Sequence, residues 1–221
     1  MKILIVDDHE LFRTGLQYLL RELSPEVEFR DLASVQAAVS QADFDPDLIL
    51  LDYHLPDMDG ADVIANILST YPTSSVVVMS GDDRPELIRS VLDAGASGFI
   101  PKNSSKELLM QALKLVLAGG IYLPAQVLLD SGITGSNDQT GNVLSADQNA
   151  SPVAQLSTRQ RESILLAIRG ASNKTIASEL DISEGTVKSH LSSAYRALGV
   201  RNRTEALLLL AGLEGNSEKP N

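Results

Sequence analysis

The chain has 221 residues, enough for one large domain or two small ones, and its charged (21%) and apolar (43%) fractions are ordinary for a globular protein. It contains no cysteine, which excludes disulfide bonds and thiolate metal sites. No apolar run approaches the roughly 20 residues that a membrane-spanning helix needs, and the opening MKILIVDD lacks the pattern of a secretory signal. We therefore expect a soluble cytoplasmic protein without a membrane partner.

The formal net charge of −11 is unevenly distributed along the chain. Residues 1–125 contain 19 acidic and nine basic side chains, whereas residues 155–221 contain nine basic and seven acidic ones. Acidic side chains favour a cation and basic ones favour phosphate backbones, so the two parts are expected to have different partners.

The first 120 residues alternate between short apolar runs and helical patterns. Strands are expected at 3–7, 27–32, 48–52, 75–80 and 98–101, and helices at 11–23, 35–42, 61–71, 85–94 and 105–118. Five strands alternating with five helices predict a parallel sheet with helices on both faces, which is the doubly wound, flavodoxin-like class. The run Leu48–Leu51 is apolar throughout, as expected of a central strand buried on both faces.

Polar side chains follow these strands at the points where the strands end. They are Asp7, Asp8, Asp52, Ser80 and Lys102. Parallel strands bring their carboxyl ends to one edge of the sheet, so these five positions are expected to lie together. Each of these polar residues taken alone would be interpreted as a solvated loop residue. All five together, each at the end of a predicted strand, favour a shared site.

Three carboxylates at one edge would repel one another without a cation among them. Oxygen ligands at this density favour Mg²⁺, and a metal-neutralised Asp52 is a suitable nucleophile toward a phosphoryl group. Ser80 and Lys102 are then placed to hold the other phosphoryl oxygens. His9 is expected at the surface, and His54 at the rim of the pocket.

The remaining chain divides into a polar stretch and a helical segment. We predict an α/β domain over 1–122, a flexible linker over 123–154 that is rich in Gly, Ser, Asn and Asp, and a four-helix domain over 155–213, followed by a polar tail over 214–221. In the helical segment, Ser157 and Gln160 form a capping-box pattern, Ser172 and Ser183 start the next helices, and Gly170 and Gly199 end helices.

Residues 173–192 predict a helix, a short turn and a second helix with polar and basic side chains away from its apolar stripe. Such a helix fits the major groove of DNA, with base-edge candidates Thr186, Lys188, Ser189, His190 and Ser192. Basic residues nearby are candidates for phosphate contacts: Lys174, Lys188, Arg196, Arg201 and Arg203. An ordinary helical bundle with a solvated charged face is the alternative.

Residues 1 to about 120 resemble the receiver domain of bacterial two-component response regulators. The matching positions are Asp7-Asp8, Asp52 with Pro56 and Gly60, Ser80, and Phe99 with Pro101-Lys102. The resemblance implies that Asp52 accepts a phosphoryl group from a phosphohistidine of a sensor histidine kinase. It also implies that Mg²⁺ is held by Asp7, Asp8, Asp52 and the backbone carbonyl of His54. Ser80 and Phe99 would be the switch residues.

Residues 156–209 resemble the LuxR-type helix-turn-helix domain, and the whole chain resembles response regulators of the NarL/FixJ type. The matching residues include Asn173-Lys174, Ile182-Ser183, Thr186-Val187-Lys188, His190 and Arg203. The resemblance implies double-stranded DNA as a partner, with Val187 added to the DNA-binding candidates, and a dimer face on the last helix. With serines at 189 and 192, single-domain affinity should be modest, which favours a homodimer on a two-half-site operator.

We therefore expect a phosphorylation-switched transcription regulator that is not an enzyme, in which the resting receiver covers the recognition helix. Two other classes remain open at this point. One is a flavodoxin-like or phosphatase-like enzyme, although no phosphate loop follows the first strand, and a phosphatase would need an acid where His54 stands. The other is a protein-binding module with an unphosphorylated receiver.

Overall fold

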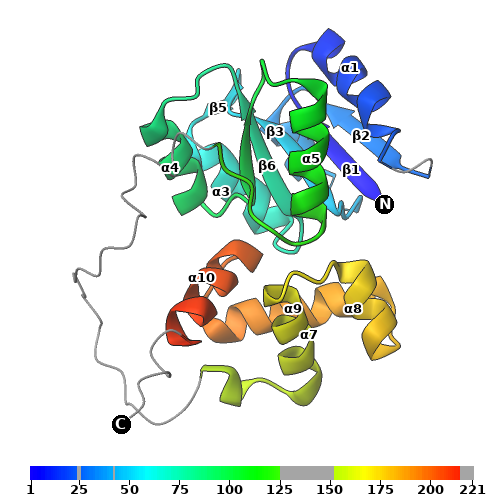
Figure 1. The fold of residues 1–221 in the computed structure, drawn as a ribbon, viewed down its shortest axis with the longest axis vertical. Coiled ribbons are helices and arrows are strands. Elements are labelled where there is room, and N and C mark those ends of the chain that lie inside the picture. The colour runs from blue at the N-terminus through cyan, green and yellow to red at the C-terminus, as the bar shows by residue number, and fades with distance from the viewer. Residues whose placement is uncertain (24–25, 42, 125–151, 215–221) are drawn as a thin grey trace.

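The computed structural model describes residues 1–23, 26–41, 43–124 and 152–214. They form two units, which we call the α/β unit (residues up to 124) and the helical unit (residues 152–214), shown above and below in Figure 1. The predicted linker falls almost entirely on residues 125–151, and the tail on 215–221, outside the described residues.

A five-stranded parallel sheet in the order β2-β1-β3-β6-β7 forms the centre of the α/β unit. The strands are β1 (Lys2–Val6), β2 (Glu28–Leu32), β3 (Leu48–Asp52), β6 (Ser75–Ser80) and β7 (Gly98–Pro101). Every residue of β3 is buried, as its apolar run predicted. Each fully buried Leu or Ile stabilises the fold by about 1.5–3 kcal/mol, so this strand fixes the middle of the sheet.

Helices cover both faces of this sheet, which confirms the doubly wound class. Side chains from alternate strand positions pack on one face with α2 (Val35–Val39), α3 (Ala61–Thr70) and α4 (Pro85–Asp93). The intervening positions pack on the other face with α1 (Glu10–Leu20) and α5 (Lys106–Leu117). The period of two in the strands therefore supplies two separate cores.

Three local features of the α/β unit differ from the expected elements. Helix α1 ends at Leu20 rather than Leu23, with Arg21 as its C-cap. Helix α2 ends at Val39 rather than Ala42, because Ser40 forms the C-cap and its hydroxyl donates to the carbonyl of Gln36 at 2.7 Å. A hairpin of two-residue strands, β4 (His54–Leu55) and β5 (Met58–Asp59), follows β3. Strands this short have no periodicity from which a sequence pattern could predict them.

The helical unit begins with a 3₁₀ turn η1 (Pro152–Gln155) and contains α7 (Thr158–Ile168), α8 (Asn173–Leu180), α9 (Glu184–Leu198) and α10 (Arg203–Glu214). The capping box of Ser157 and Gln160 is present, and the hydroxyls of Ser172 and Ser183 cap the next two helices. These helices share one core, which includes Ile164, Ile176, Leu191 and Tyr195. The short turn between α8 and α9 gives the helix-turn-helix predicted from the sequence.

The helical unit packs against the amino edge of the sheet, where the strands begin (Figure 1). Lys188 of α9 meets the segment before β3, and Thr204 of α10 lies 3.4 Å from the hydroxyl of Ser97, which precedes β7. Asn202 and Thr204 are both buried. The two units therefore touch at the edge opposite to the one where Asp52 lies.

Candidate functional site

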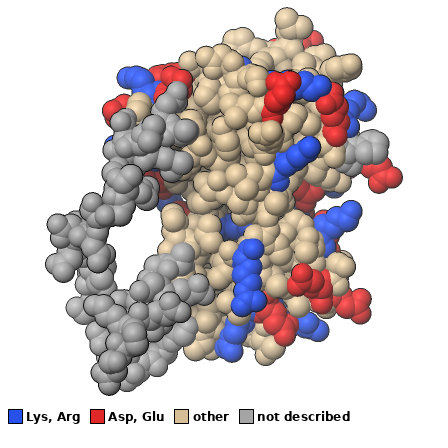
Figure 2. All heavy atoms as spheres, in the orientation of Figure 1, with Lys and Arg blue, Asp and Glu red and all other residues tan. Residues whose placement is uncertain are grey.

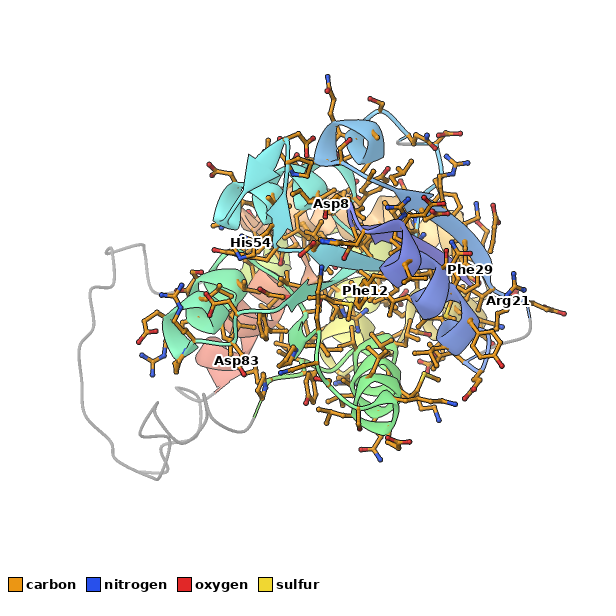
Figure 3. The ribbon with its side chains drawn as sticks, turned by 90° about the horizontal axis from the view of Figure 1, so that it is seen from above. Asp8, Phe12, Arg21, Phe29, His54 and Asp83 are labelled. Carbon is orange, nitrogen blue, oxygen red and sulfur yellow. The ribbon has the colours of Figure 1, made fainter. Side chains whose placement is uncertain are left out.

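The carboxyl edge of the sheet brings the sequence-predicted side chains together. Asp7 follows β1, Asp52 ends β3, Ser80 ends β6 and Lys102 follows β7. Asp7 and Asp52 are almost fully buried, at 2% and 3% exposure, although both carry carboxylates. Figure 3, seen from above this edge, shows Asp8 and His54 on neighbouring loops near its centre. Because every strand runs in the same direction, the four strand ends converge as the alternation predicted.

Lys102 joins the two buried carboxylates. Its ammonium Nζ lies 2.7 Å from Oδ2 of Asp52 and 2.7 Å from Oδ2 of Asp7. The ring of Phe12, on α1, lies 4.8 Å from the same nitrogen and adds a cation–π contact. One cation therefore offsets two acids in a place with little water.

The pKa values follow from this arrangement. Burial raises the pKa of Asp52 above its ordinary value, the hydrogen bond from Lys102 opposes that shift, and repulsion from Asp7 adds to it. For Lys102, burial acts to lower the pKa, but the hydrogen bonds to Asp52 and Asp7 outweigh it and raise the pKa. The lysine is thus held in its charged form, and the acidic pair retains excess negative charge that a metal ion would offset.

Four side chains here fit a divalent cation. One ligand atom from each of Asp7, Asp8, His9 and Asp52 lies within 4.8 Å of the others. Carboxylate oxygens at this density suit a hard ion such as Mg²⁺. The backbone N–H of His54 donates to Oδ1 of Asp52 at 3.3 Å, which fixes the loop after β3. His9 was expected only at the surface: its side chain is 68% exposed, yet its Nδ1 reaches Asp8 at 2.8 Å.

The two predicted switch residues are both fully buried. Phe99 lies in the core between the sheet and α4 with no exposed surface, which is the inward orientation. Ser80 is also fully buried, and its hydroxyl oxygen accepts a hydrogen bond from the backbone N–H of Asp82 at 3.1 Å. Ser80 and Phe99 therefore lie on neighbouring strands, next to the acidic pocket.

The second predicted site lies on α8 and α9. Lys174 and Ser189 are exposed, whereas Thr186, His190 and Ser192 are partly exposed. Thr186 belongs to the N-terminal cap of α9, where its hydroxyl lies 2.8 Å from that of Ser183. Figure 2 shows basic side chains, interspersed with acidic ones, on the surface of the lower, helical unit. Lys174 lies on α8, where it lines a pocket together with Asp47 of the α/β unit, and the other four positions lie on α9.

The structure gives two DNA-binding candidates other roles. Val187 is fully buried in the core of the helical unit, because it occupies the apolar stripe of α9 and faces inward. The guanidinium of Arg203 donates to the carbonyls of Ala167 at 2.6 Å and Ala171 at 2.9 Å, and burial lowers its pKa. Arg203 therefore holds α10 against the end of α7, and contact of these two residues with DNA stays a prediction.

Lys188 is the DNA-binding candidate that the α/β unit covers. Its Nζ lies 3.0 Å from Oδ2 of Asp45 and 3.5 Å from Oδ1 of Asp47, and it donates to the carbonyl of Asp45 at 3.1 Å. Only 9% of the residue is exposed. Nothing in the sequence pattern marked Asp45 or Asp47, because their role exists only where the two units meet.

Comparison with known families matches each of the two units to a family. Residues 3–114 match the family described as "Response regulator receiver domain", and residues 154–210 match "Bacterial regulatory proteins, luxR family". Together these matches span the two units that the structure shows.

Relatives and a solved structure cover nearly the whole chain. It is 36% identical to the glycerol metabolism activator of Pseudomonas putida, over 94% of this chain and 93% of that protein. It is 32% identical to the nitrate/nitrite response regulator protein NarL of Escherichia coli strain K12, over 92% of each. A structure of the RcsB response regulator of Salmonella typhimurium has a similar fold, with a TM-score of 0.54 at 24% identity, covering 96% of this chain and 98% of that one.

The fold and the two sites define a transcription regulator with a receiver domain and a helix-turn-helix domain. The chain belongs to the response regulators whose DNA-binding domain is of the luxR family. None of the helices in the described ranges has the length and apolar character that crossing a bilayer requires.

Proposed function

We propose that Asp52 accepts a phosphoryl group from a phosphohistidine of a sensor histidine kinase, and that this step controls DNA binding. The observation that carries the proposal is the contact of Lys102 with both Asp7 and Asp52, at 2.7 Å each, on the edge where three strands end. A buried carboxylate with a fixed cation beside it is suited to receive a group that brings further negative charge.

The chemistry assigned to each residue follows from its position. An oxygen of Asp52 attacks the phosphorus, the bond from phosphorus to the histidine nitrogen breaks, and that nitrogen keeps the electron pair. Lys102 already contacts Asp52, so its ammonium moves only slightly to hold a phosphoryl oxygen, and the Ser80 hydroxyl holds another. When bound to Asp7, Asp8, Asp52 and the carbonyl of His54, Mg²⁺ supplies charge neutralisation.

We also propose that this structure is the resting form, in which the receiver covers part of the recognition helix. Lys188, a candidate for DNA contact, is occupied by Asp45 and Asp47 of the receiver. A DNA phosphate would need the same ammonium, so the receiver and DNA compete for it. Phosphorylation at Asp52 would then favour separation of the two units through the Ser80–Phe99 region.

On DNA we propose a homodimer on a two-half-site operator. Lys174, Thr186, Ser189, His190 and Ser192 remain the candidates for contact, together with Lys188 once it is released. Leu208 is 63% exposed on α10, an apolar side chain suited to the predicted dimer face. Because its operator would lie on a bacterial chromosome, we place the protein in the cytoplasm.

The acceptor is tested by intact-mass spectrometry after treating the full chain with acetyl phosphate and Mg²⁺. The unmodified sequence should gain one phosphoryl group and Asp52→Asn should gain none, because an amide oxygen does not form the acyl phosphate. Asp62→Asn, in the exposed first turn of α3, is the matched control and should still be modified. Equal modification of Asp52→Asn and the original sequence would exclude Asp52 as the phosphoryl acceptor.

The covering of the recognition helix is tested on DNA fragments selected from a random pool. Footprinting compares the affinity of the full chain for a selected fragment with and without the phosphodonor. We expect tighter binding after phosphorylation and no such gain in Asp52→Asn. Equal affinity in both states would contradict the covered resting form while leaving the phosphoacceptor assignment intact.

A further inference from the structure

His9 lies closer to the acidic pocket than a surface residue needs to be. Its Nδ1 is 2.8 Å from Oδ1 of Asp8, 3.1 Å from Oδ1 of Asp7 and 4.0 Å from Oδ2 of Asp52. The ring nitrogen therefore faces three carboxylates, and the side chain is otherwise 68% exposed.

The backbone fixes this orientation. The N–H of His9 donates to Oδ1 of Asp7 at 2.8 Å, which turns the chain back over the acidic pair. His9 is also the N-cap residue of α1, with φ −87° and ψ 100°, so the start of the helix restrains its backbone. The imidazole is thus positioned by its own loop.

The distances fit the ligand sphere of one metal ion. Atoms bound at about 2.1 Å from an octahedral ion lie about 3 Å apart when adjacent and about 4.2 Å apart when opposite. The separations from Nδ1 to Asp8 and Asp7, at 2.8 and 3.1 Å, match adjacent positions, and the separation to Asp52, at 4.0 Å, matches opposite ones. Because most of the ring is exposed, Nε2 can carry the proton toward water and leave the Nδ1 lone pair for the metal.

We propose that Nδ1 of His9 is a fourth side-chain ligand of the receiver's divalent cation. Imidazole favours borderline ions over Mg²⁺, so His9 shifts the selectivity of the site toward Co²⁺, Ni²⁺ or Zn²⁺. The inference rests on the cation site of the proposed function and adds a ligand and a metal preference to it. The other arrangement compatible with these distances is an Nδ1–H that donates to the carboxylates and must leave when a metal enters.

Mn²⁺ is the probe, because pulsed electron paramagnetic resonance detects an imidazole nitrogen bound to it. The chain has three histidines, so the experiment compares the full-length protein with His9→Gln and with His54→Gln, which lies on the same rim. We expect imidazole coupling in the original sequence and in His54→Gln, and its loss in His9→Gln. The dissociation constant for Co²⁺ should rise roughly tenfold in His9→Gln, against less than about threefold for Mg²⁺.

Absence of imidazole coupling from the Mn²⁺-loaded original sequence would overturn the inference. Loss of the imidazole coupling in His54→Gln, with retention of the coupling in His9→Gln, would also overturn the inference. Tighter Mg²⁺ binding by His9→Gln than by the original sequence would overturn it as well, because it would mean that the His9 ring competes with the metal ion for the carboxylates. If neither Mg²⁺ nor Mn²⁺ binds the original sequence, the cation site itself fails. Mg²⁺ binding with no nitrogen ligand defeats only the role of His9. Thermal unfolding of each variant checks that the fold is kept.

Discussion

Lys102 is the side chain on which the resting pocket depends. It is 20% exposed and contacts two carboxylates that are 2% and 3% exposed, so it is the cation that offsets both of them within the described residues. A buried carboxylate that loses its partner keeps its desolvation cost and loses the compensating attraction. In the absence of metal, this lysine therefore stabilises the pocket.

Lys102→Gln should lower the free energy of unfolding by about 2 kcal/mol in the absence of divalent ions, because Asp7 and Asp52 lose a charged hydrogen-bond donor. Added Mg²⁺ should restore part of that loss, since it offsets the same carboxylates. Urea unfolding with and without Mg²⁺ measures both effects.

Lys106→Gln is the matched control. Its ammonium pairs with Glu22 at 2.6 Å, at a surface where each side chain is about half exposed, and its loss should change stability little. A large loss in Lys106→Gln, or none in Lys102→Gln, would contradict the account of the pocket.

Most of the pocket could be predicted at the residue scale, because its members occupy the ends of predicted strands. Asp7, Asp52, Ser80 and Lys102 lie where the alternation of elements places them. The approach of the Nδ1 atom of His9 to Asp7 and Asp8 could not be predicted, since it depends on the direction of one side chain in a loop. Val187 and Arg203 have structural roles that the motif match did not indicate. Val187 packs in the core of the helical unit, and Arg203 donates to two backbone carbonyls.

At the scale of elements, strands were predicted where apolar runs had clear ends, and helices where capping residues marked them. Gly170 and Gly199 have φ of 93° and 71°, and Gly is the residue that adopts these values without strain, so both helix ends followed from the sequence. The β4–β5 hairpin and the early end of α2 depend on contacts made by only a few residues. Neither leaves a periodic signal.

The capping box of α7 gives a prediction at this scale. The hydroxyl oxygen of Ser157 accepts from the N–H of Gln160 at 3.3 Å, and the side chain of Gln160 accepts from the N–H of Ser157 at 2.9 Å. Ser157→Ala should destabilise the helical unit by about 1 kcal/mol, because it leaves an N-terminal N–H without its partner. Thermal unfolding followed by circular dichroism measures the change.

Ser189→Ala is a contrast with the same chemical change. Ser189 is exposed in the interior of α9, where alanine is the better helix former, so this substitution should leave stability unchanged or raise it slightly. Equal losses of stability in Ser157→Ala and Ser189→Ala would mean that the hydrogen bonds of the cap make no specific contribution to the stability of the helical unit.

At the scale of the whole molecule, the strands connect the two sites. The segment before β3 carries Asp47 at the interface between the units, and β3 ends at Asp52 in the pocket. Likewise Ser97, beside Thr204, precedes β7, and Lys102 follows it. Strands β3 and β7 therefore run from the interface between the units to the acidic pocket. Sequence patterns could predict each unit but not this contact between them.

Asp45 offers the sharpest test of that contact. It is one of two described residues other than glycine with a positive φ, at 49°, and asparagine tolerates this conformation well. Asp45→Asn therefore removes the charge that faces Lys188 at 3.0 Å while keeping the turn. Because Asp45 is 53% exposed, solvent weakens the ion pair, and its loss should raise the DNA affinity of the unphosphorylated chain by no more than about fivefold. Affinity after phosphorylation should not change.

The control for this variant is Asp43→Asn, in the same loop. Asp43 is 81% exposed and lies 3.4 Å from Arg30, away from the helical unit. If the gain came only from lower negative charge near DNA, Asp43→Asn would show it as well, whereas release of Lys188 predicts a gain in Asp45→Asn alone. The gain in DNA affinity of Asp45→Asn should shrink as salt concentration rises. Salt screens the ion pair of Lys188 and Asp45 in the original sequence, so the two proteins differ less in their affinity for DNA. Identical affinities of Asp45→Asn and the original sequence at low salt would mean that this contact does not restrain the recognition helix.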